Sequence, residues 1–355
     1  MARDSRSTEV TASVDSRQYI VAVVGAGVTG GRVAGLLAAD RSIRVGIVDQ
    51  SPAAASRVAR SVKGAVIEEG DCMAADVVVL AQPAPHAALA ARLASHGVSV
   101  VSMSDDVDDV RALVDLDDAA RVSAATLLVG AAMSPGLSGL LARHLASQLH
   151  WVDEIHVAMH GTGGPACARQ HHTALGGTAL GYHDDQWVER PAGVGRELCW
   201  FPEPVNSYDC YRAEMPDPLL LHRAFPSAGR LSARMSATRR DRLTARLPML
   251  RPPHKEGGLG GLRVEVRGSL ADGARETLVV GTAVRSAVAA AAVAAASTRW
   301  MLHGTPEHGV VVLGDAALPC ADLLAAVQVG GVRLFEYTGV VRAPREDGAN
   351  AGGES

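Results

Sequence analysis

The sequence predicts an α/β protein in which a doubly wound parallel sheet is followed by a second, α+β domain on a largely antiparallel sheet. Two patterns predict this. Over residues 18–148, short apolar runs alternate with helical patterns, which is typical of consecutive βα units. Over residues 149–283, the strands alternate apolar and polar residues, which is typical of antiparallel sheets. The 355 residues, 48% of them hydrophobic, suffice for two such domains.

The first βα unit carries a dinucleotide-binding pattern. An apolar run at residues 19–24 leads into Gly25-Ala26-Gly27-Val28-Thr29-Gly30, and a second apolar run, residues 43–48, ends in Asp49. In this pattern the first glycine makes a tight turn, the second admits a pyrophosphate, and the third lets helix and strand pack closely. The pyrophosphate then lies at a helix N-terminus. We therefore expect a Rossmann sheet that binds a dinucleotide.

The end of the second strand predicts which dinucleotide binds. A carboxylate at Asp49 accepts hydrogen bonds from a ribose 2′-hydroxyl and repels a 2′-phosphate, so we expect NAD, with NADP as the alternative. Gln50 adds no positive charge, and Arg57 lies one or two helical turns further on. Ligands of such sheets bind beyond the carboxyl ends of the strands. The expected cofactor-binding residues are Gly25, Gly27, Val28, Thr29, Gly30, Asp49, Gln50, Gln82, Pro83 and Ser102.

The alternation continues after the fingerprint. Ser51 and Pro52 begin a helix that Gly64 ends. The further elements expected in the first domain are strands at 65–67, 76–81, 98–102 and 126–130, and helices at 86–96 and 110–120. In the second domain, strands at 262–268 and 275–281 flank Asp272-Gly273 as a hairpin. A helix at 282–303, a helix at 322–329 and a strand at 332–337 form a C-terminal segment, residues 284–342, that we expect to pack back onto the first domain.

Charge and cysteine content exclude several classes of protein. A formal net charge of −4 without a polybasic block argues against nucleic acid or a membrane as the main partner. Five cysteines without a C-x-x-C pair predict neither a disulfide scaffold nor a structural zinc site. Residues 1–17 lack the apolar core of a signal peptide, so we expect a cytoplasmic protein with disordered tails at 1–17 and 343–355. The apolar window at 286–300 is too short to span a bilayer and predicts a buried helix.

Five segments resemble a known family. They are the glycine fingerprint, Val77-Val78-Val79-Leu80-Ala81-Gln82-Pro83 with His86 after it, Val100-Val101-Ser102-Met103-Ser104, Gly130-Ala131-Ala132-Met133-Ser134-Pro135-Gly136, and Gly163-Gly164-Pro165-Ala166. In this order they resemble the saccharopine dehydrogenase-like NAD(P)-dependent oxidoreductases. The resemblance implies a nucleotide in the first domain, a small-molecule substrate in the cleft, and a second domain that forms a homodimer. The reaction it implies is hydride transfer at a carbon bonded to nitrogen.

Two residues depart from the family pattern and bear on the substrate. Met103 stands where such enzymes commonly have a tyrosine, and Ser134 where they have an aspartate; we expect both at the substrate. The loss of these polar groups argues against saccharopine as the substrate. It favours another amino-acid-derived imine, amine or carbonyl compound of a biosynthetic pathway as the substrate. Two alternatives stay open: a non-redox protein that holds the dinucleotide as a structural or regulatory ligand, and an enoyl reductase.

The densest group of candidate catalytic residues follows the glycine turn of the second domain. His171 or His172 could donate a proton at neutral pH, with a packed or solvated histidine pair as the alternative of equal weight. Arg169 could bind a substrate carboxylate. Cys167 could act as a nucleophile, although a small buried residue is the more frequent role of such a cysteine.

Three further patterns are less specific. A metal site built from Cys167, His171 and His172 with His156 and His160 is not expected, because no catalytic zinc motif is present. Tyr211 and Arg212 lie in a region that concentrates the scarce aromatic residues, which predicts either a cleft wall that binds substrate or a core. The arginine-rich stretch 230–255 predicts a solvated face, with capture of an anionic ligand as the alternative.

Overall fold

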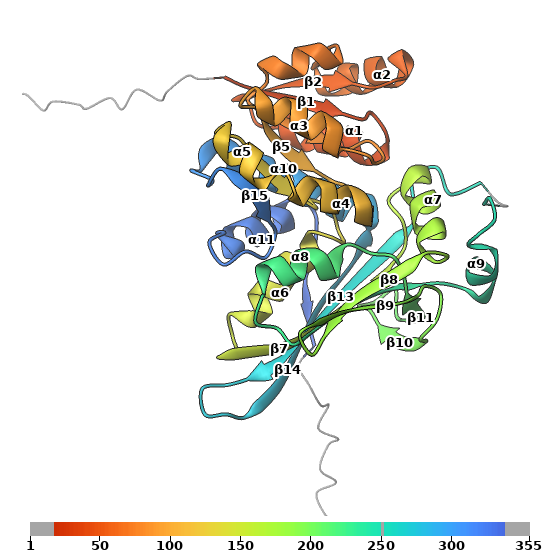
Figure 1. Cartoon of the computed structure of the whole chain (residues 1–355). Coiled ribbons are helices and arrows are strands. Elements are labelled where there is room, and N and C mark those ends of the chain that lie inside the picture. Colours follow the sequence, from red (N-terminus) through yellow and green to blue (C-terminus); the bar gives the residue numbers. More distant parts are fainter. Residues whose placement is uncertain (1–17, 250–251, 338–355) are drawn as a thin grey trace, which may run out of the picture.

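The computed structural model describes residues 18–249 and 252–337, and it contains two large sheets. The first sheet, with its helices, forms one end of the molecule, and the second sheet forms the other end (Figure 1). Helix α7 and helix α4 lie where the two parts meet (Figure 1). The predicted fold class is confirmed. The expected tails at 1–17 and 343–355 lie outside the described residues.

The first sheet is parallel and has seven strands in the order β15-β6-β5-β4-β1-β2-β3. Its strands are β1 (Tyr19–Val24), β2 (Ile43–Val48), β3 (Ala65–Val66), β4 (Val77–Leu80), β5 (Ser99–Ser102), β6 (Thr126–Val129) and β15 (Gly309–Val312). The connecting helices are α1 (Val28–Ala38), α2 (Pro52–Val62), the 3-10 helix η1 (Glu69–Ala74), α3 (Ala87–Ser95), α4 (Val107–Val114), α5 (Asp117–Val122) and α6 (Leu137–Ala146). Strands β4, β6 and β15 are buried along their whole length, as expected for a sheet covered on both faces.

The second sheet is mixed and mostly antiparallel, and its main path runs β10-β11-β12-β7-β13-β14-β16. Its strands are β7 (Trp151–His160), β8 (Thr178–His183), β9 (Gln186–Pro191), β10 (Glu197–Trp200), β11 (Ser207–Arg212), β12 (Arg230–Ser236), β13 (Leu259–Ser269), β14 (Arg275–Arg285) and β16 (Phe335–Glu336). Helices α7 (Pro165–Ala174), α8 (Asp217–Ala224) and α9 (Arg239–Thr244) connect them. The predicted hairpin at Asp272-Gly273 is confirmed as β13 and β14, and β12 with β7 is a parallel pair.

The C-terminal segment differs from its prediction in three respects. Strand β14 continues to Arg285, so helix α10 (Ser286–His303) begins at Ser286 and not at residue 282. Strand β15, which was not predicted, adds a seventh strand beside β6. Strand β16 pairs with β14 in the second sheet, although its Glu336 also contacts His144 of α6 at 3.3 Å. A strand of two to four residues has too short an apolar–polar pattern to be recognised in the sequence. Its position is determined by pairing with strands that lie far away in the chain.

Helix α10 is the buried helix that its alanine-rich sequence predicts, and it packs against α1, β4 and β5 of the first domain. Small alanine side chains permit this close approach. Helix α11 (Cys320–Val329) packs against α10 and α6. The predicted helix at 110–120 is two helices, α4 and α5, because the chain turns after Val114. Among the described residues, no helix is both long and apolar enough to cross a membrane.

Candidate active site between the two sheets

The three fingerprint glycines are required for different reasons. Gly25 has φ +110°, and a Cβ there would lie 2.6 Å from the backbone N of Gln82. A Cβ at Gly30 would lie 1.8 Å from the carbonyl O of Gly25. Gly27 differs from both: it is exposed, has φ −72°, and a Cβ there would meet no atom within 4 Å. The protein's own packing therefore explains Gly25 and Gly30 but leaves the glycine at position 27 unexplained.

The space in front of Gly27 suits an anion. Gly27 is the N-cap of α1; no side chain caps this helix, and its first turn contains no acidic residue. Unpaired N–H groups and the positive end of the helix dipole therefore face an open region. A pyrophosphate fits there, because phosphates bind at helix N-termini where a glycine lets them approach the backbone. These residues are compatible with a bound dinucleotide.

Asp49 links the end of β2 to this loop. Its Oδ2 accepts a hydrogen bond of 2.6 Å from the backbone N–H of Ala26, and its Oδ1 accepts one of 2.7 Å from that of Ser51. The carboxylate is thus fixed beside the glycine turn and remains partly exposed. Each carboxylate oxygen can accept a second hydrogen bond, so both remain available to ribose hydroxyls. Gln50, which follows Asp49, is exposed.

The second domain closes over the loop. A Cβ on Gly163 would lie 3.5 Å from Oγ1 of Thr29, and a Cβ on Gly164 would lie 3.3 Å from Cγ2 of Val28. The glycine turn of the second domain therefore packs against the first residues of α1. Helix α7, which begins directly after this turn at Pro165, is held next to the proposed dinucleotide site.

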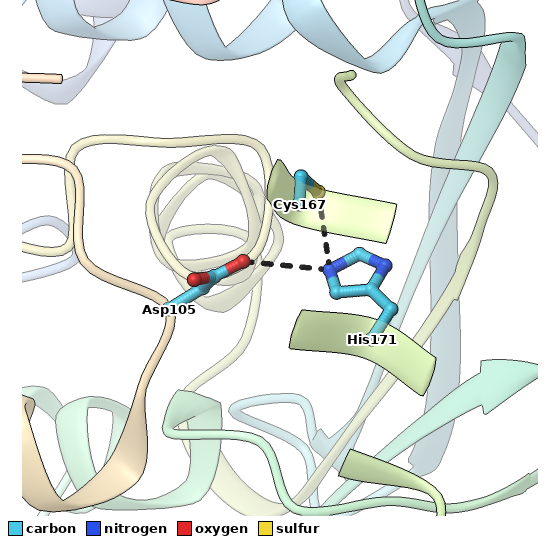
Figure 2. A group of neighbouring side chains, drawn as sticks. All are labelled: Asp105, Cys167 and His171. Carbon is cyan, nitrogen blue, oxygen red and sulfur yellow. Dashed lines mark hydrogen bonds and ion pairs between the residues drawn. The ribbon is translucent and has the colours of Figure 1, made fainter. Parts of the chain in front are cut away.

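A cluster of three side chains joins the two domains. Cys167 and His171 are one turn apart on α7, and Asp105 lies on the loop after β5 of the first domain (Figure 2). The Nε2 of His171 is 3.5 Å from the Sγ of Cys167 and 3.5 Å from the Oδ2 of Asp105. Next to it, the amide of Gln170 donates a 3.1 Å hydrogen bond to Asp106, the N-cap of α4. The contacts of α7 with the first domain are thus polar.

Both contacts of His171 use the same ring nitrogen (Figure 2). In a nucleophilic triad the base uses one ring nitrogen for the nucleophile and the other for the carboxylate. This cluster is therefore not a triad. It surrounds a single N–H of His171 with a sulfur and a carboxylate, and the backbone N–H of Gly163 donates a 3.3 Å hydrogen bond to that sulfur.

The surroundings of His171 favour its charged form. Burial alone lowers the pKa of this imidazole, but the interactions with Cys167 and Asp105 outweigh burial and hold the pKa well above its ordinary value. The ring is largely buried, with a side-chain exposure of 12%. The nearly buried ring of His171 therefore lies among groups that favour its imidazolium form.

The neighbouring histidine has a structural position. His172 is buried, and its Nε2 donates a 3.1 Å hydrogen bond to the carbonyl of Leu247. The two other histidines considered for a metal site, His156 and His160, lie on β7 and bind Ser232 and Ser236 of β12. The structure therefore brings only Cys167 and His171 of that set together, and it adds Asp105.

Thiolate, imidazole and carboxylate form a donor set that zinc accepts, and one ligand atom from each lies within 4.8 Å of the others. The expectation of no metal site rests on spacing along the chain, which does not reveal Asp105. Asp105 follows Ser102 by three residues, and an acid directly after the carboxyl end of a parallel strand was the signal that could have identified it.

The side chain of Ser102, a predicted cofactor-binding residue, is buried against a histidine. It is 1% exposed, and its hydroxyl lies 2.9 Å from Nδ1 of the buried His86. The Nε2 of His86 donates to the carbonyl of Gln82, so Nδ1 accepts the proton of Ser102. Burial lowers the pKa of His86 and keeps it neutral. This pair ties the carboxyl ends of β4 and β5 together, next to Gln82 and the exposed Pro83.

Ser134 is also buried and contacts a residue that sequence analysis missed. The hydroxyls of Ser134 and Ser138 donate hydrogen bonds of 2.8 and 2.6 Å to Oδ1 of Asp217, the first residue of α8. Asp217 is 1% exposed, and its Oδ2 has no partner among the described residues. Burial raises the pKa of its carboxyl to about 6, although both serines lower it. A carboxyl group from a residue 83 positions away in sequence thus lies beside Ser134.

The remaining predicted substrate contacts have different positions. Tyr211 and Arg212 are adjacent on β11, and strand alternation directs them to opposite faces. Tyr211 is buried beneath the guanidinium of Arg242, 4.0 Å from its ring, whereas Arg212 lines a groove away from His171. Arg212 thus lies apart from His171, and its contact with a substrate stays a prediction. Arg169 is exposed on α7, and Met103 is partly exposed on the loop that leads to Asp105.

Comparison with known proteins shows a shared fold. No family model and no curated protein matches the chain. Among solved structures, saccharopine dehydrogenase (L-Glu forming) from Saccharomyces cerevisiae aligns with a TM-score of 0.64 at 15% identity, covering 90% of this chain and 99% of that one. GenD2 from gentamicin A biosynthesis, solved in complex with NAD, aligns at 16% identity over 95% and 99% of the two chains, with a TM-score of 0.45. A putative myo-inositol dehydrogenase from Sinorhizobium meliloti aligns at 14% identity over 88% and 95%, with a TM-score of 0.47.

The first of these likenesses spans both domains. The chain has a saccharopine dehydrogenase-like fold, as the resemblance of its five segments predicts.

Proposed function

We propose that the chain is an NAD-dependent oxidoreductase that transfers hydride to or from a small, amino-acid-derived imine or amine, or a carbonyl compound, between the two domains, in a biosynthetic pathway. The observation that carries the proposal is Gly27, a glycine with an ordinary backbone conformation whose missing side chain leaves open space at an uncapped helix N-terminus. Asp49, fixed beside this loop, favours NAD over NADP.

His171 supplies the proton in this proposal. NADH, when bound, supplies the hydride. The substrate carbon accepts the hydride, and its double bond to nitrogen or oxygen becomes a single bond. The nitrogen or oxygen accepts the proton from Nε2 of His171. Cys167 and Asp105 hold the imidazole charged before the transfer. His171 recovers a proton from solvent afterwards, and Arg169, exposed on the same helix, is placed to bind a substrate carboxylate.

The position of the cluster supports this role. Ligands of parallel α/β sheets bind outside the carboxyl ends of the strands, and Asp105 follows the carboxyl end of β5. Helix α7 faces this region from the second domain, because its glycine turn packs on Val28 and Thr29. A substrate bound there would lie between the strand ends of the first domain and His171 of the second domain. That the chain forms a homodimer remains a prediction.

The test is a turnover panel with NADH. Purified protein is offered aldehydes, ketones with and without amines, preformed cyclic imines and enones, and both NADH loss and product mass are measured. We expect NADH loss with an imine or carbonyl compound and none for Gly27→Val. Turnover of enones alone would indicate an enoyl reductase. Tight NADH binding without turnover of any compound would instead support the non-redox alternative.

A further inference from the structure

The second sheet divides into two branches at strand β12. At its first residues β12 pairs with β8 (Arg230 with His183), and at its last residues with β11 (Arg234 with Arg212). Ser232 and Ala233, between these pairings, have no strand partner on that edge. The two branches therefore diverge and leave a groove of about 330 Å³, which is large enough for a small ligand.

Positive charge exceeds negative charge in this groove. Five arginines line it, against two glutamates: Arg190, Arg212, Arg230, Arg234 and Arg267, with Glu197 and Glu265. Arg234 pairs with Glu197 at 2.7 Å, and Arg267 pairs with Glu265 at 2.6 Å. Among the residues that the structure describes, neither Arg190 nor Arg212 has a carboxylate within salt-bridge distance, so two guanidinium charges are uncompensated.

Arg212 is the central residue of the groove. Its guanidinium lies against Gly195, where a Cβ would be 2.3 Å from one of its terminal nitrogens. Burial, followed by the charges of Arg234, Arg190 and Arg230, lowers the pKa of Arg212. Like charges that are crowded together destabilise a folded protein, and an anion that binds between them removes this cost.

We propose that the groove between β8 and β11 binds the phosphoryl group of a small molecule, with Arg212 and Arg190 as its main ligands. Two uncompensated guanidinium groups match the charge of a phosphate monoester, which is about −1.5 to −2 at pH 7. The groove is separate from the Asp105–Cys167–His171 cluster, since none of these three residues lines it. It is therefore a second binding site, independent of the proposed reaction.

The test uses inorganic phosphate as the probe and the full chain as the protein. The melting temperature, and binding by calorimetry, are measured in phosphate, acetate and chloride at matched ionic strength. Every protein in the test carries Gly27→Val, which removes phosphate binding at the N-terminus of helix α1. We expect phosphate to raise the melting temperature above its value in chloride, with acetate much less effective. Arg212→Gln should weaken phosphate binding at least tenfold, and in chloride it should melt at a higher temperature than its parent, because repulsion is relieved.

Two further variants make the test decisive. Arg190→Gln changes an exposed residue of β9, so it keeps the test valid where Arg212→Gln fails to fold, and we expect the same loss of binding. Arg196→Gln is the matched control: this exposed arginine pairs with Asp209, does not line the groove, and its loss should leave phosphate binding unchanged. Equal effects of phosphate and chloride, or equal phosphate affinity in Arg190→Gln and its parent, would overturn the proposal.

Discussion

His171 of the second domain and Asp105 of the first domain lie 3.5 Å apart and form one polar contact between the two halves of the molecule. The imidazole is nearly buried, and its charge depends on residues of both halves, Cys167 on its own helix and Asp105 across the interface. A change in the distance between the domains therefore changes the pKa of the proposed proton donor. In this account the donor is fully charged only when the domains are together.

The two adjacent histidines of α7 should respond differently to substitution. His171→Ala should lose about 10²-fold or more in turnover with little loss of stability, because it removes the proton donor. His172→Ala should keep most of its turnover and lose about 1–3 kcal/mol of stability, because it removes a buried imidazole and its hydrogen bond to the carbonyl of Leu247. Initial rates and denaturant unfolding of both variants measure these effects. Equal turnover in the two variants would show that the donor lies elsewhere.

The pH dependence of the proposed reduction follows from the raised pKa of His171. The charged form is the donor, so turnover should be retained through neutral pH and fall as the pH rises through the raised pKa. Cys167→Ala and Asp105→Asn each remove a partner that raises the pKa of His171, so each should move the alkaline fall to lower pH. Rate profiles and an NMR titration of the imidazole measure it. An unchanged pKa in both variants contradicts the role of the cluster.

Asp49 should determine the choice of cofactor. We expect the wild type to bind NADH at least tenfold more tightly than NADPH, which is about 1.4 kcal/mol. Asp49→Asn removes the charge and retains one acceptor oxygen for the N–H of Ala26, so it separates charge from loop geometry. It should weaken the preference, and adding Gln50→Arg should reverse it. Titrations with both reduced cofactors decide this, and a wild type that prefers NADPH would show that Asp49 does not contact the ribose.

Zinc should inhibit the enzyme by competing with the proton of His171. Metal binding to imidazole and thiolate requires deprotonated ligands, so inhibition should strengthen as the pH rises and weaken at least tenfold in Cys167→Ala. Rates at buffered zinc concentrations, together with the metal content of the purified protein, measure this. The opposite result would be a purified protein that contains stoichiometric zinc, is active, and loses its activity when a chelator removes the metal. That result would make the cluster a catalytic metal site.

The buried carboxyl of Asp217 should reduce stability above its pKa. Its pKa is about 6 in the folded protein, against an ordinary value of 3.8 for a solvated aspartate, so the folded state holds the proton more tightly. The stability that this group contributes is fully present below pH 3.8 and is lost as the pH rises to about 6. Asp217→Asn should therefore be more stable than wild type at pH 8, by up to about 3 kcal/mol, and equally stable at low pH. Unfolding curves at both pH values test this sign.

Local sequence signals predicted the elements with strong patterns. The glycine turn, the second strand and Asp49 lie as the fingerprint predicts, and the hairpin at Asp272-Gly273 forms because its turn residues specify it. The position of Asp105 after a parallel strand was a local signal for that residue, but the partners of Asp105 and Asp217 could not be predicted, since they lie on distant elements. The face of β11 on which Arg212 lies could not be predicted either, because composition identifies a region but not the face of a strand.

Binding of NADH to the glycine loop is the central claim, and one titration tests it most directly. The fluorescence of NADH is followed for the wild type, Gly27→Val and the matched control Gly35→Val. Gly35 lies on the same helix, is exposed, and a Cβ there likewise meets no atom within 4 Å. We predict saturable binding to the wild type and to Gly35→Val, and at least a tenfold loss in a Gly27→Val protein with an unchanged melting temperature. Equal affinity for NADH in all three proteins would contradict the account.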